Sequence, residues 1–147
     1  MSLVVDASVA LKWFLSEEPH ASQAVAVVQD GATLIAPDFL IAEVCNAAWR
    51  SARLGRISQA QVDAIAANLP RFFDSLVSVS SLARRAVAIA GQLDHPVYDC
   101  LYLALAEAEQ AELVTADMRL LSKVQATTWE QRVVDLTGYR PGSRERA

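Results

Sequence analysis

The chain has 147 residues and a mass of 15.9 kDa, the size of one domain, so a second domain is not expected. No apolar run reaches the roughly 18 residues of a membrane helix, and the N-terminus starts with a strand-like segment instead of a signal sequence, so we expect a soluble, cytoplasmic protein with no membrane partner. A net charge of -4 and a pI near 5.1 exclude binding of nucleic acid through global electrostatics, although a local basic patch remains compatible.

The hydrophobic content is high for so small a soluble domain. Hydrophobic residues make up 53% of the chain, and the mean hydropathy is +0.23. We therefore expect a partner to cover part of the apolar surface. That partner is a second copy of the chain, another protein, or both.

The first half of the chain alternates strand-like and helical segments. In chain order, the pattern predicts a strand over 3–5, a helix over 8–15, a helix over 19–29 ended by Gly31, and a strand over 33–36. A longer helix follows over 38–54, with Asp38 as its N-cap and Gly55 at its end. The segment Ser58-Gln59-Ala60-Gln61 resembles a capping box that opens another helix, which extends to about residue 69.

The second half continues this alternation. It predicts, in order, a strand over 76–79, helices over 81–93 and 98–111, a strand over 113–115, a helix over 118–124 and a short strand over 133–134. Strands that alternate with helices of this length pair in parallel through crossovers. The predicted fold class is therefore α/β, a three-layer α/β/α sandwich with a central parallel sheet. We expect one domain over residues 1–137 and a flexible polar tail over 138–147.

Four acidic residues stand where strands end or where helices begin or turn inward. They are Asp6 after Leu3-Val4-Val5, Glu43 in the helix after Pro37, Asp99 after His95-Pro96, and Asp117 after Leu113-Val114-Thr115. Ligand sites of parallel sheets lie beyond the carboxyl ends of the strands, where Asp6 and Asp117 fall. Carboxylates that converge there can hold a hard divalent cation, which takes oxygen ligands. The residues therefore predict a metal-dependent hydrolase.

Each acid also has a structural explanation that the sequence leaves open. Asp6 and Asp117 would cap the helices that follow them. Asp99 would favour the positive end of its helix, and Glu43 would lie on a solvated helix face. Asp99 is the hardest to explain in this way, because its helix is apolar on all sides and no Lys or Arg lies nearby in sequence. All four acids stand at positions from which they could reach one site, and this favours a shared function over four separate structural roles.

Three polar residues are candidates for supporting the acids. Ser8 and Thr115 each stand two positions from an acid and can orient a carboxylate by a hydrogen bond, although capping and strand propensity explain them nearly as well. Asn46 shares a helix face with Glu43.

Candidate RNA contacts are weaker. Arg50 and Arg53 are an i,i+3 pair on the helix that carries Glu43, and they suit either phosphate contact or ordinary solvated surface. Trp13 suits packing better than base stacking. His20 and His95 stand beside or near proline and are interpreted as turn residues, not as ligands or bases.

Other α/β classes with acidic or phosphate sites do not fit. A receiver domain would have adjacent acids at its first strand and a lysine after a late strand, and a haloacid-dehalogenase-like phosphatase would have an acid at the position of Ser8. A nucleotide-binding domain would show a glycine-rich loop, but the five glycines are not clustered.

Taken together, the motifs resemble those of PIN-domain ribonucleases, in particular the toxins of VapBC-type toxin-antitoxin systems. The resemblance rests on four motifs in the family's order: Val4-Val5-Asp6-Ala7-Ser8, Pro37-Asp38 with Glu43 and Asn46, His95-Pro96-Val97-Tyr98-Asp99 with the apolar helix after it, and Leu113-Val114-Thr115-Ala116-Asp117. It covers residues 3–134, nearly the whole chain.

The resemblance implies a function for these residues. Asp6, Glu43, Asp99 and Asp117 would hold Mg2+ or Mn2+, supported by Ser8, Asn46 and Thr115. The implied activity is endonucleolytic cleavage of single-stranded RNA by a homodimer. A small antitoxin would mask the acidic site, often with an arginine. The alternative is a catalytically inactive PIN-like module that regulates through protein contacts.

Overall fold

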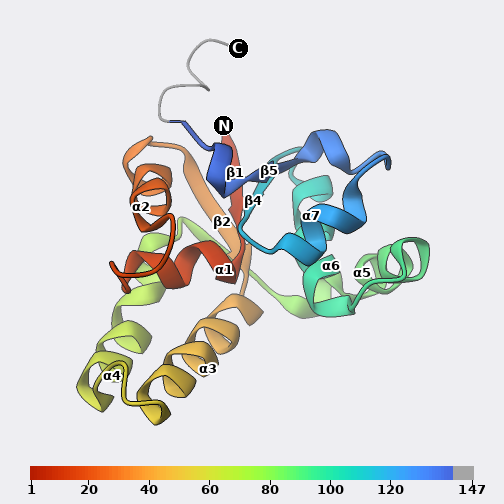
Figure 1. The fold of residues 1–147 in the computed structure, drawn as a ribbon. Coiled ribbons are helices and arrows are strands. Elements are labelled where there is room, and N and C mark those ends of the chain that lie inside the picture. The colour runs from red at the N-terminus through yellow and green to blue at the C-terminus, as the bar shows by residue number, and fades with distance from the viewer. Residues whose placement is uncertain (141–147) are drawn as a thin grey trace.

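The structure is a computed structural model, and it describes residues 1–140 (Figure 1). The strands are β1 (Ser2–Val5), β2 (Thr33–Pro37), β3 (Ser75–Val77), β4 (Glu112–Thr115) and β5 (Val133–Asp135). The α-helices are α1 (Ala7–Ala10), α2 (Ala21–Gln29), α3 (Phe39–Arg53), α4 (Gln59–Asn68), α5 (Val79–Leu93), α6 (Val97–Ala108) and α7 (Met118–Val124). Short 3-10 turns η1 (Leu11–Trp13), η2 (Leu69–Phe72), η3 (Glu130–Arg132) and η4 (Leu136–Gly138) complete the described chain.

The five strands form one parallel sheet in the order β3-β2-β1-β4-β5. Val4 of β1 is the centre of the register, opposite Ile35 of β2 on one side and Leu113 of β4 on the other. Helices cover both faces, with α1 and α2 on one side of the sheet and α5, α6 and α7 on the other (Figure 1). The predicted fold class, a three-layer sandwich with a central parallel sheet, is confirmed.

The strand order determines where a site can form. From β1 the chain moves outward to β2 and β3, and it then returns to β4 and β5 on the other side of β1. Right-handed crossovers in opposite directions place their helices on opposite faces, which explains the two helical layers. The crossovers leave β1 and β4 toward opposite edges of the sheet, so the strand order reverses between these two strands. The crevice beyond their carboxyl ends is therefore the expected ligand position. In Figure 1 this edge faces downward, where α3, α6 and α7 begin.

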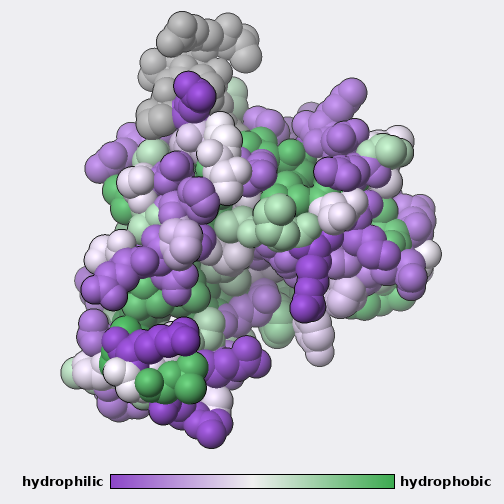
Figure 2. Space-filling model, in the orientation of Figure 1, coloured by the Kyte–Doolittle hydropathy of each residue, from purple (hydrophilic) through white to green (hydrophobic). Residues whose placement is uncertain are grey.

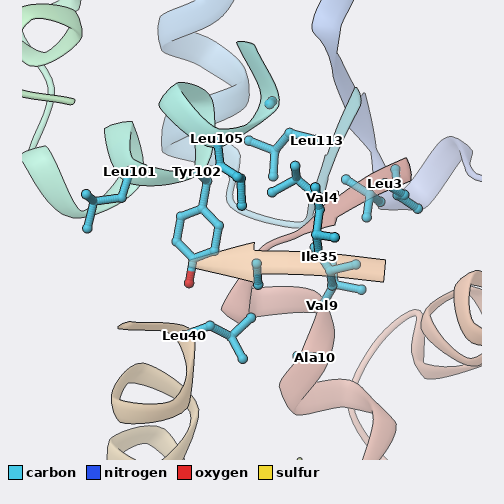
Figure 3. Packing of buried hydrophobic residues seen from close by; sticks show 14 of the residues in the cluster. Leu3, Val4, Val9, Ala10, Ile35, Leu40, Leu101, Tyr102, Leu105 and Leu113 are labelled. Carbon is cyan, nitrogen blue, oxygen red and sulfur yellow. The ribbon is translucent and has the colours of Figure 1, made fainter. Parts of the chain in front are cut away.

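The core is built on the central strands. Leu3, Val4 and Val5 are fully buried, as expected for a strand covered on both faces. Tyr102 of α6 is the largest fully buried side chain. Its ring extends from α6 past the end of β2 toward Leu40 of α3, so that its hydroxyl reaches the carboxyl edge of the sheet (Figure 3).

Most predicted elements are confirmed, with corrections at some ends. The predicted capping box is present, because the Ser58 hydroxyl accepts from the Gln61 N–H and the Gln61 side chain accepts from the Ser58 N–H. Several boundaries differ from prediction by two or three residues. The strand predicted over 76–79 ends at Val77, since Ser78 caps α5, and the helix predicted over 98–111 ends at Ala108. The predicted helix over 8–15 is a single α-turn followed by η1.

Asp38 stands at the N-cap position of α3, but its side chain does not cap that helix. Its Oδ1 accepts a hydrogen bond of 3.2 Å from the Val79 N–H, at the start of α5. The predicted N-cap position of Asp38 is confirmed, but the predicted capping hydrogen bond is not formed. The Asp38 carboxylate therefore links the start of α3 to the start of α5.

The predicted polar tail lies mostly outside the described residues, since 141–147 are not described. At its predicted start, Gly138 ends η4, and Tyr139 is 5% exposed with its hydroxyl bonded to Asp30 Oδ2 at 2.5 Å. Tyr139 is therefore packed against the rest of the chain, whereas Gly138 is exposed.

The outer surface mixes polar and apolar areas (Figure 2). An apolar area lies at the tip where α3 and α4 meet, in keeping with the exposed Leu54 between these helices. Within residues 1–140, no helix has the length and apolar character needed to cross a bilayer.

Candidate active site

The structure brings the four predicted acids to one edge of the sheet. Asp6 follows β1 directly, Asp117 stands two residues after β4, Glu43 lies in the second turn of α3, and Asp99 lies in the first turn of α6. Their charges interact, because Asp6, Asp99 and Asp117 each raise the pKa of Glu43. Four segments that are distant in sequence thus form one acidic centre.

Asp6 is the most firmly held of these carboxylates and is only 4% exposed. Its Oδ2 accepts hydrogen bonds from the Thr115 hydroxyl at 2.5 Å and from the Ser8 hydroxyl at 2.9 Å. Ser8 is itself fixed by the Ala116 N–H, which donates to its oxygen at 3.0 Å. Burial raises the Asp6 pKa from 3.8 to about 6, against the lowering effect of the two hydroxyls. Asp6 makes no helix-capping bond, so the capping explanation does not hold.

Glu43 is half-buried and bonded across the site. The Tyr102 hydroxyl donates to its Oε1 at 2.5 Å, joining α3 to α6. Burial raises the Glu43 pKa from 4.5 to about 7; the Tyr102 hydrogen bond lowers it, and the neighbouring acids raise it. Glu43 is therefore not a solvated helix residue.

Asp99 is hydrogen-bonded to His95, which the sequence analysis interpreted as a turn residue. Its Oδ2 lies 2.6 Å from Nε2 of the buried His95, one helical turn earlier. Burial raises the Asp99 pKa, the His95 hydrogen bond lowers it, and smaller charge effects come from Asp117, which raises it, and from Arg119, which lowers it. His95 does stand in the turn between α5 and α6, but it also holds a site carboxylate.

Asp117 combines two roles. Its Oδ1 accepts from the Arg119 N–H at 2.9 Å, so it caps α7 as the structural explanation proposed. Its own N–H donates to the Thr115 hydroxyl at 3.0 Å. Thr115 therefore connects Asp6 and Asp117 directly, since the same hydroxyl donates to Asp6.

The other predicted site residues lie apart from this network. Asn46 is exposed, and its side chain makes no hydrogen bond with any residue in the described part of the chain. Arg50 is exposed, and the Arg53 guanidinium lies 5.1 Å from the Trp49 ring centroid. Trp13 stacks on Phe72 at 4.9 Å and donates its indole N–H to the Ala24 carbonyl, so packing accounts for its position.

Sequence reasoning missed His95 and Tyr102 as members of the site. For Tyr102 the spacing offered a signal, because it stands three residues after Asp99 on the same helix and so shares its face. His95 precedes α6, so helix periodicity did not point to it. Arg119 was not predicted to belong to the site, and its charge lowers the pKa of Asp99.

The donor set suits a hard divalent cation. All four candidate ligands are carboxylates, and within residues 1–140 no Lys or Arg forms an ion pair with any of them. As the described side chains stand, no three His, Cys, Asp or Glu residues are close enough to form a ready-made metal site. The fit therefore rests on the chemistry and mutual repulsion of the donors, which a cation would relieve.

Comparison with known proteins agrees with this geometry. The PIN domain family model matches residues 3–126. Ribonuclease VapC3 of Pyrobaculum aerophilum is 35% identical over 130 residues, which cover 86% of this chain and 97% of that protein.

Two solved structures share the fold. The crystal structure of PAE2754 from Pyrobaculum aerophilum has a TM-score of 0.70 at 24% identity and covers 93% of each chain. A toxin-antitoxin complex from Klebsiella pneumoniae has a TM-score of 0.66 at 19% identity, covering 91% of this chain and 97% of that one. From the family match and the extent of the VapC3 relationship, the chain belongs to the PIN domain family and, within it, to the VapC group.

Proposed function

We propose that this protein is a metal-dependent endoribonuclease that cleaves single-stranded RNA in the cytoplasm as the toxin of a toxin-antitoxin pair. The observation that carries the proposal is the convergence of Asp6, Glu43, Asp99 and Asp117 at the switch point of the sheet. The relationship to a ribonuclease supports the RNA substrate.

Asp6, Glu43, Asp99 and Asp117 would hold Mg2+ or Mn2+, which supplies positive charge for a phosphodiester and lowers the pKa of a bound water. The four carboxylates alone would repel the phosphate, so activity requires the cation. The proposal involves no serine or histidine nucleophile, since Ser8 and His95 are both engaged with site carboxylates.

The residues around the acids position them. Ser8 and Thr115 direct the same oxygen of Asp6, while Tyr102 and His95 hold one oxygen each of Glu43 and Asp99. Such outer contacts fix the orientation of ligands and change both affinity and activity when they are removed. Asn46, exposed one turn from Glu43, would contribute only through water or substrate.

The nuclease activity is tested with purified protein and labelled single-stranded RNA, duplex RNA and single-stranded DNA. We expect cleavage of single-stranded RNA with Mg2+ or Mn2+, and none with EDTA. Asp99→Asn serves as the control for a contaminating nuclease. Cleavage that survives chelation, or that persists in the variant, contradicts the mechanism.

The partners are tested separately. We propose a homodimer and a cognate antitoxin that covers the acidic centre, in part with an arginine, which presents a planar fork suited to carboxylates. Light scattering over a dilution series should report a dimer, and a monomer at every concentration contradicts it. Inhibition by the co-expressed antitoxin should weaken as Mg2+ rises, because arginine and cation compete for the same oxygens. Inhibition that is independent of metal contradicts direct competition.

A further inference from the structure

A stacked aromatic pair stands beside the acidic centre. The rings of Phe39 and Tyr98 lie 5.2 Å apart between centroids at an interplanar angle of 13°, which is a stacked arrangement. Phe39 is the first residue of α3, and Tyr98 is the second residue of α6. The pair therefore joins the starts of the two helices that carry Glu43 and Asp99.

The spacing brings this pair close to the acids. Phe39 lies one helical turn before Glu43, and Tyr98 lies one turn before Tyr102, so each pair shares a helix face. Tyr102, one turn after Tyr98, donates its hydroxyl to Glu43. The same two helices are thus linked twice, by the ring stack and by a hydrogen bond to a proposed metal ligand.

Tyr98 is exposed, although its ring stacks on Phe39. The residue is 61% exposed, which is incompatible with cover on both ring faces, while Phe39 covers one face. Val97 and Met118, which flank Asp99 and Asp117, are exposed as well. Val97, Tyr98 and Met118 are the exposed apolar residues next to Asp99 and Asp117 in the chain; we call them the apolar rim, and one face of its Tyr98 ring is open to solvent.

We propose that Tyr98, supported by Phe39, is a stacking site for a nucleobase next to the cleaved phosphate. The inference rests on the proposed ribonuclease function and deepens it. Unstacked bases of single-stranded RNA offer free faces to aromatic side chains, whereas paired bases in a duplex do not. A ring already held parallel to its support loses little conformational freedom when a base stacks on it. The site thereby contributes to selection of single strands without reading sequence.

The test measures RNA affinity apart from chemistry. Fluorescence anisotropy with a labelled single-stranded RNA is performed in an Asp6→Asn background with Mg2+ present. The variants are Tyr98→Ala, Tyr98→Leu, which keeps apolar bulk without an aromatic face, and Tyr98→Phe, which keeps the ring. Trp49→Ala is the matched control, since Trp49 is an exposed aromatic of α3 covered by Arg53 and away from the starts of α3 and α6.

We expect Tyr98→Ala and Tyr98→Leu to weaken binding about tenfold, within the range measured for loss of one base stack. Tyr98→Phe and Trp49→Ala should stay within about twofold of the parent. In the active protein, Tyr98→Ala should raise KM and leave kcat nearly unchanged. An abasic nucleotide at one position of the RNA should reproduce the loss in the parent and add nothing in Tyr98→Ala.

Several outcomes overturn the inference. Equal RNA affinity of Tyr98→Ala and the parent contradicts it, as does a loss that is the same for every abasic position. If Tyr98→Ala changes the oligomeric state in light scattering and leaves RNA affinity unchanged, the rim is a protein interface. A parent chain that cleaves RNA with no Tyr98 effect refutes the stacking site alone, whereas one that neither binds nor cleaves RNA refutes the proposed function itself.

Discussion

The four carboxylates at the centre of this protein differ in how their oxygens are held. Asp6 accepts two hydroxyl hydrogen bonds on one oxygen, and Glu43 accepts one from Tyr102. Asp99 is bonded to His95. These contacts favour the ionised forms, but burial opposes them and keeps the pKa values of the three groups raised. A cation is the compensation that the described residues lack.

Asp6→Asn should reduce RNA cleavage by roughly a hundredfold to a thousandfold or more, the scale for loss of one preorganised electrostatic group. Asparagine preserves the shape and leaves an oxygen for Ser8 and Thr115. In EDTA at neutral pH the melting temperature should match or exceed that of the parent, because a buried charge is removed. Near-normal cleavage, or a large loss of stability, contradicts the assignment of Asp6.

Tyr102→Phe should shift the acidic limb of the cleavage profile to higher pH. The Tyr102 hydroxyl lowers the Glu43 pKa, so its removal raises that pKa and leaves more of the carboxyl protonated near neutrality. The ring packing is kept, and the lost hydrogen bond to a charged group is worth about 1.5 to 3 kcal/mol. A pH profile of kcat/KM checks this, and an unshifted limb shows that Glu43 does not need the hydroxyl.

At the scale of elements, α3 and α6 serve both the core and the site. Leu40 and Val44 of α3 are buried while Glu43 faces α6, and the fully buried ring of Tyr102 ends in a hydroxyl at the site. The local boundaries of such helices follow from short-range chemistry, as the reciprocal capping box at Ser58 and Gln61 shows for α4.

Ser58→Ala should lower the free energy of unfolding by about 1 kcal/mol, the usual cost of losing an N-cap. The cap opens α4, which carries none of the four acids, so cleavage at a temperature well below the midpoint should be unchanged. Urea denaturation measures the first effect, and Ser58→Thr, which keeps the hydroxyl, is the matched control. A parallel loss of activity would show that α4 is coupled to the site.

At the scale of the whole molecule, the four acids lie together beyond the carboxyl ends of β1 and β4, where the strand order reverses. Carboxylates so close together repel one another, and a bound cation would relieve this repulsion. Without metal, the raised pKa values make stability depend on pH, and the direction follows from proton linkage.

In EDTA, the contribution of Asp6 and Glu43 to stability should fall as pH rises from the unfolded to the folded pKa values of these two groups. The pKa of Asp6 rises on folding from 3.8 to about 6 and that of Glu43 from 4.5 to about 7. The folded chain therefore binds more protons than the unfolded chain between these values, so deprotonation favours unfolding and the effect is complete above them. The free energy of unfolding of Glu43→Gln, relative to the parent, should increase from about pH 5 to about pH 8. Urea titrations with EDTA test this, and a difference that is constant with pH contradicts it.

The sequence by itself determined the elements and the fold class. Hydrophobic periodicity, the capping box at Ser58 and the glycines at 31 and 55 are local signals, and both glycines adopt the positive φ that favours this residue. The sequence also pointed to the four acids as candidates. Asp6 and Asp117 follow parallel strands and so lie at the ligand edge of such a sheet. Glu43 and Asp99 stand near the starts of helices instead.

Only the tertiary structure decided what holds those acids. The Thr115 hydroxyl donates to Asp6 across 109 positions of sequence, and Tyr102 donates to Glu43 across 59. Asp38 looked like a helix cap but is bonded to the backbone of Val79, 41 positions away. Periodicity and capping rules describe contacts within one or two helical turns, whereas a carboxylate takes its hydrogen bonds from whichever donor the packing of distant elements brings within reach.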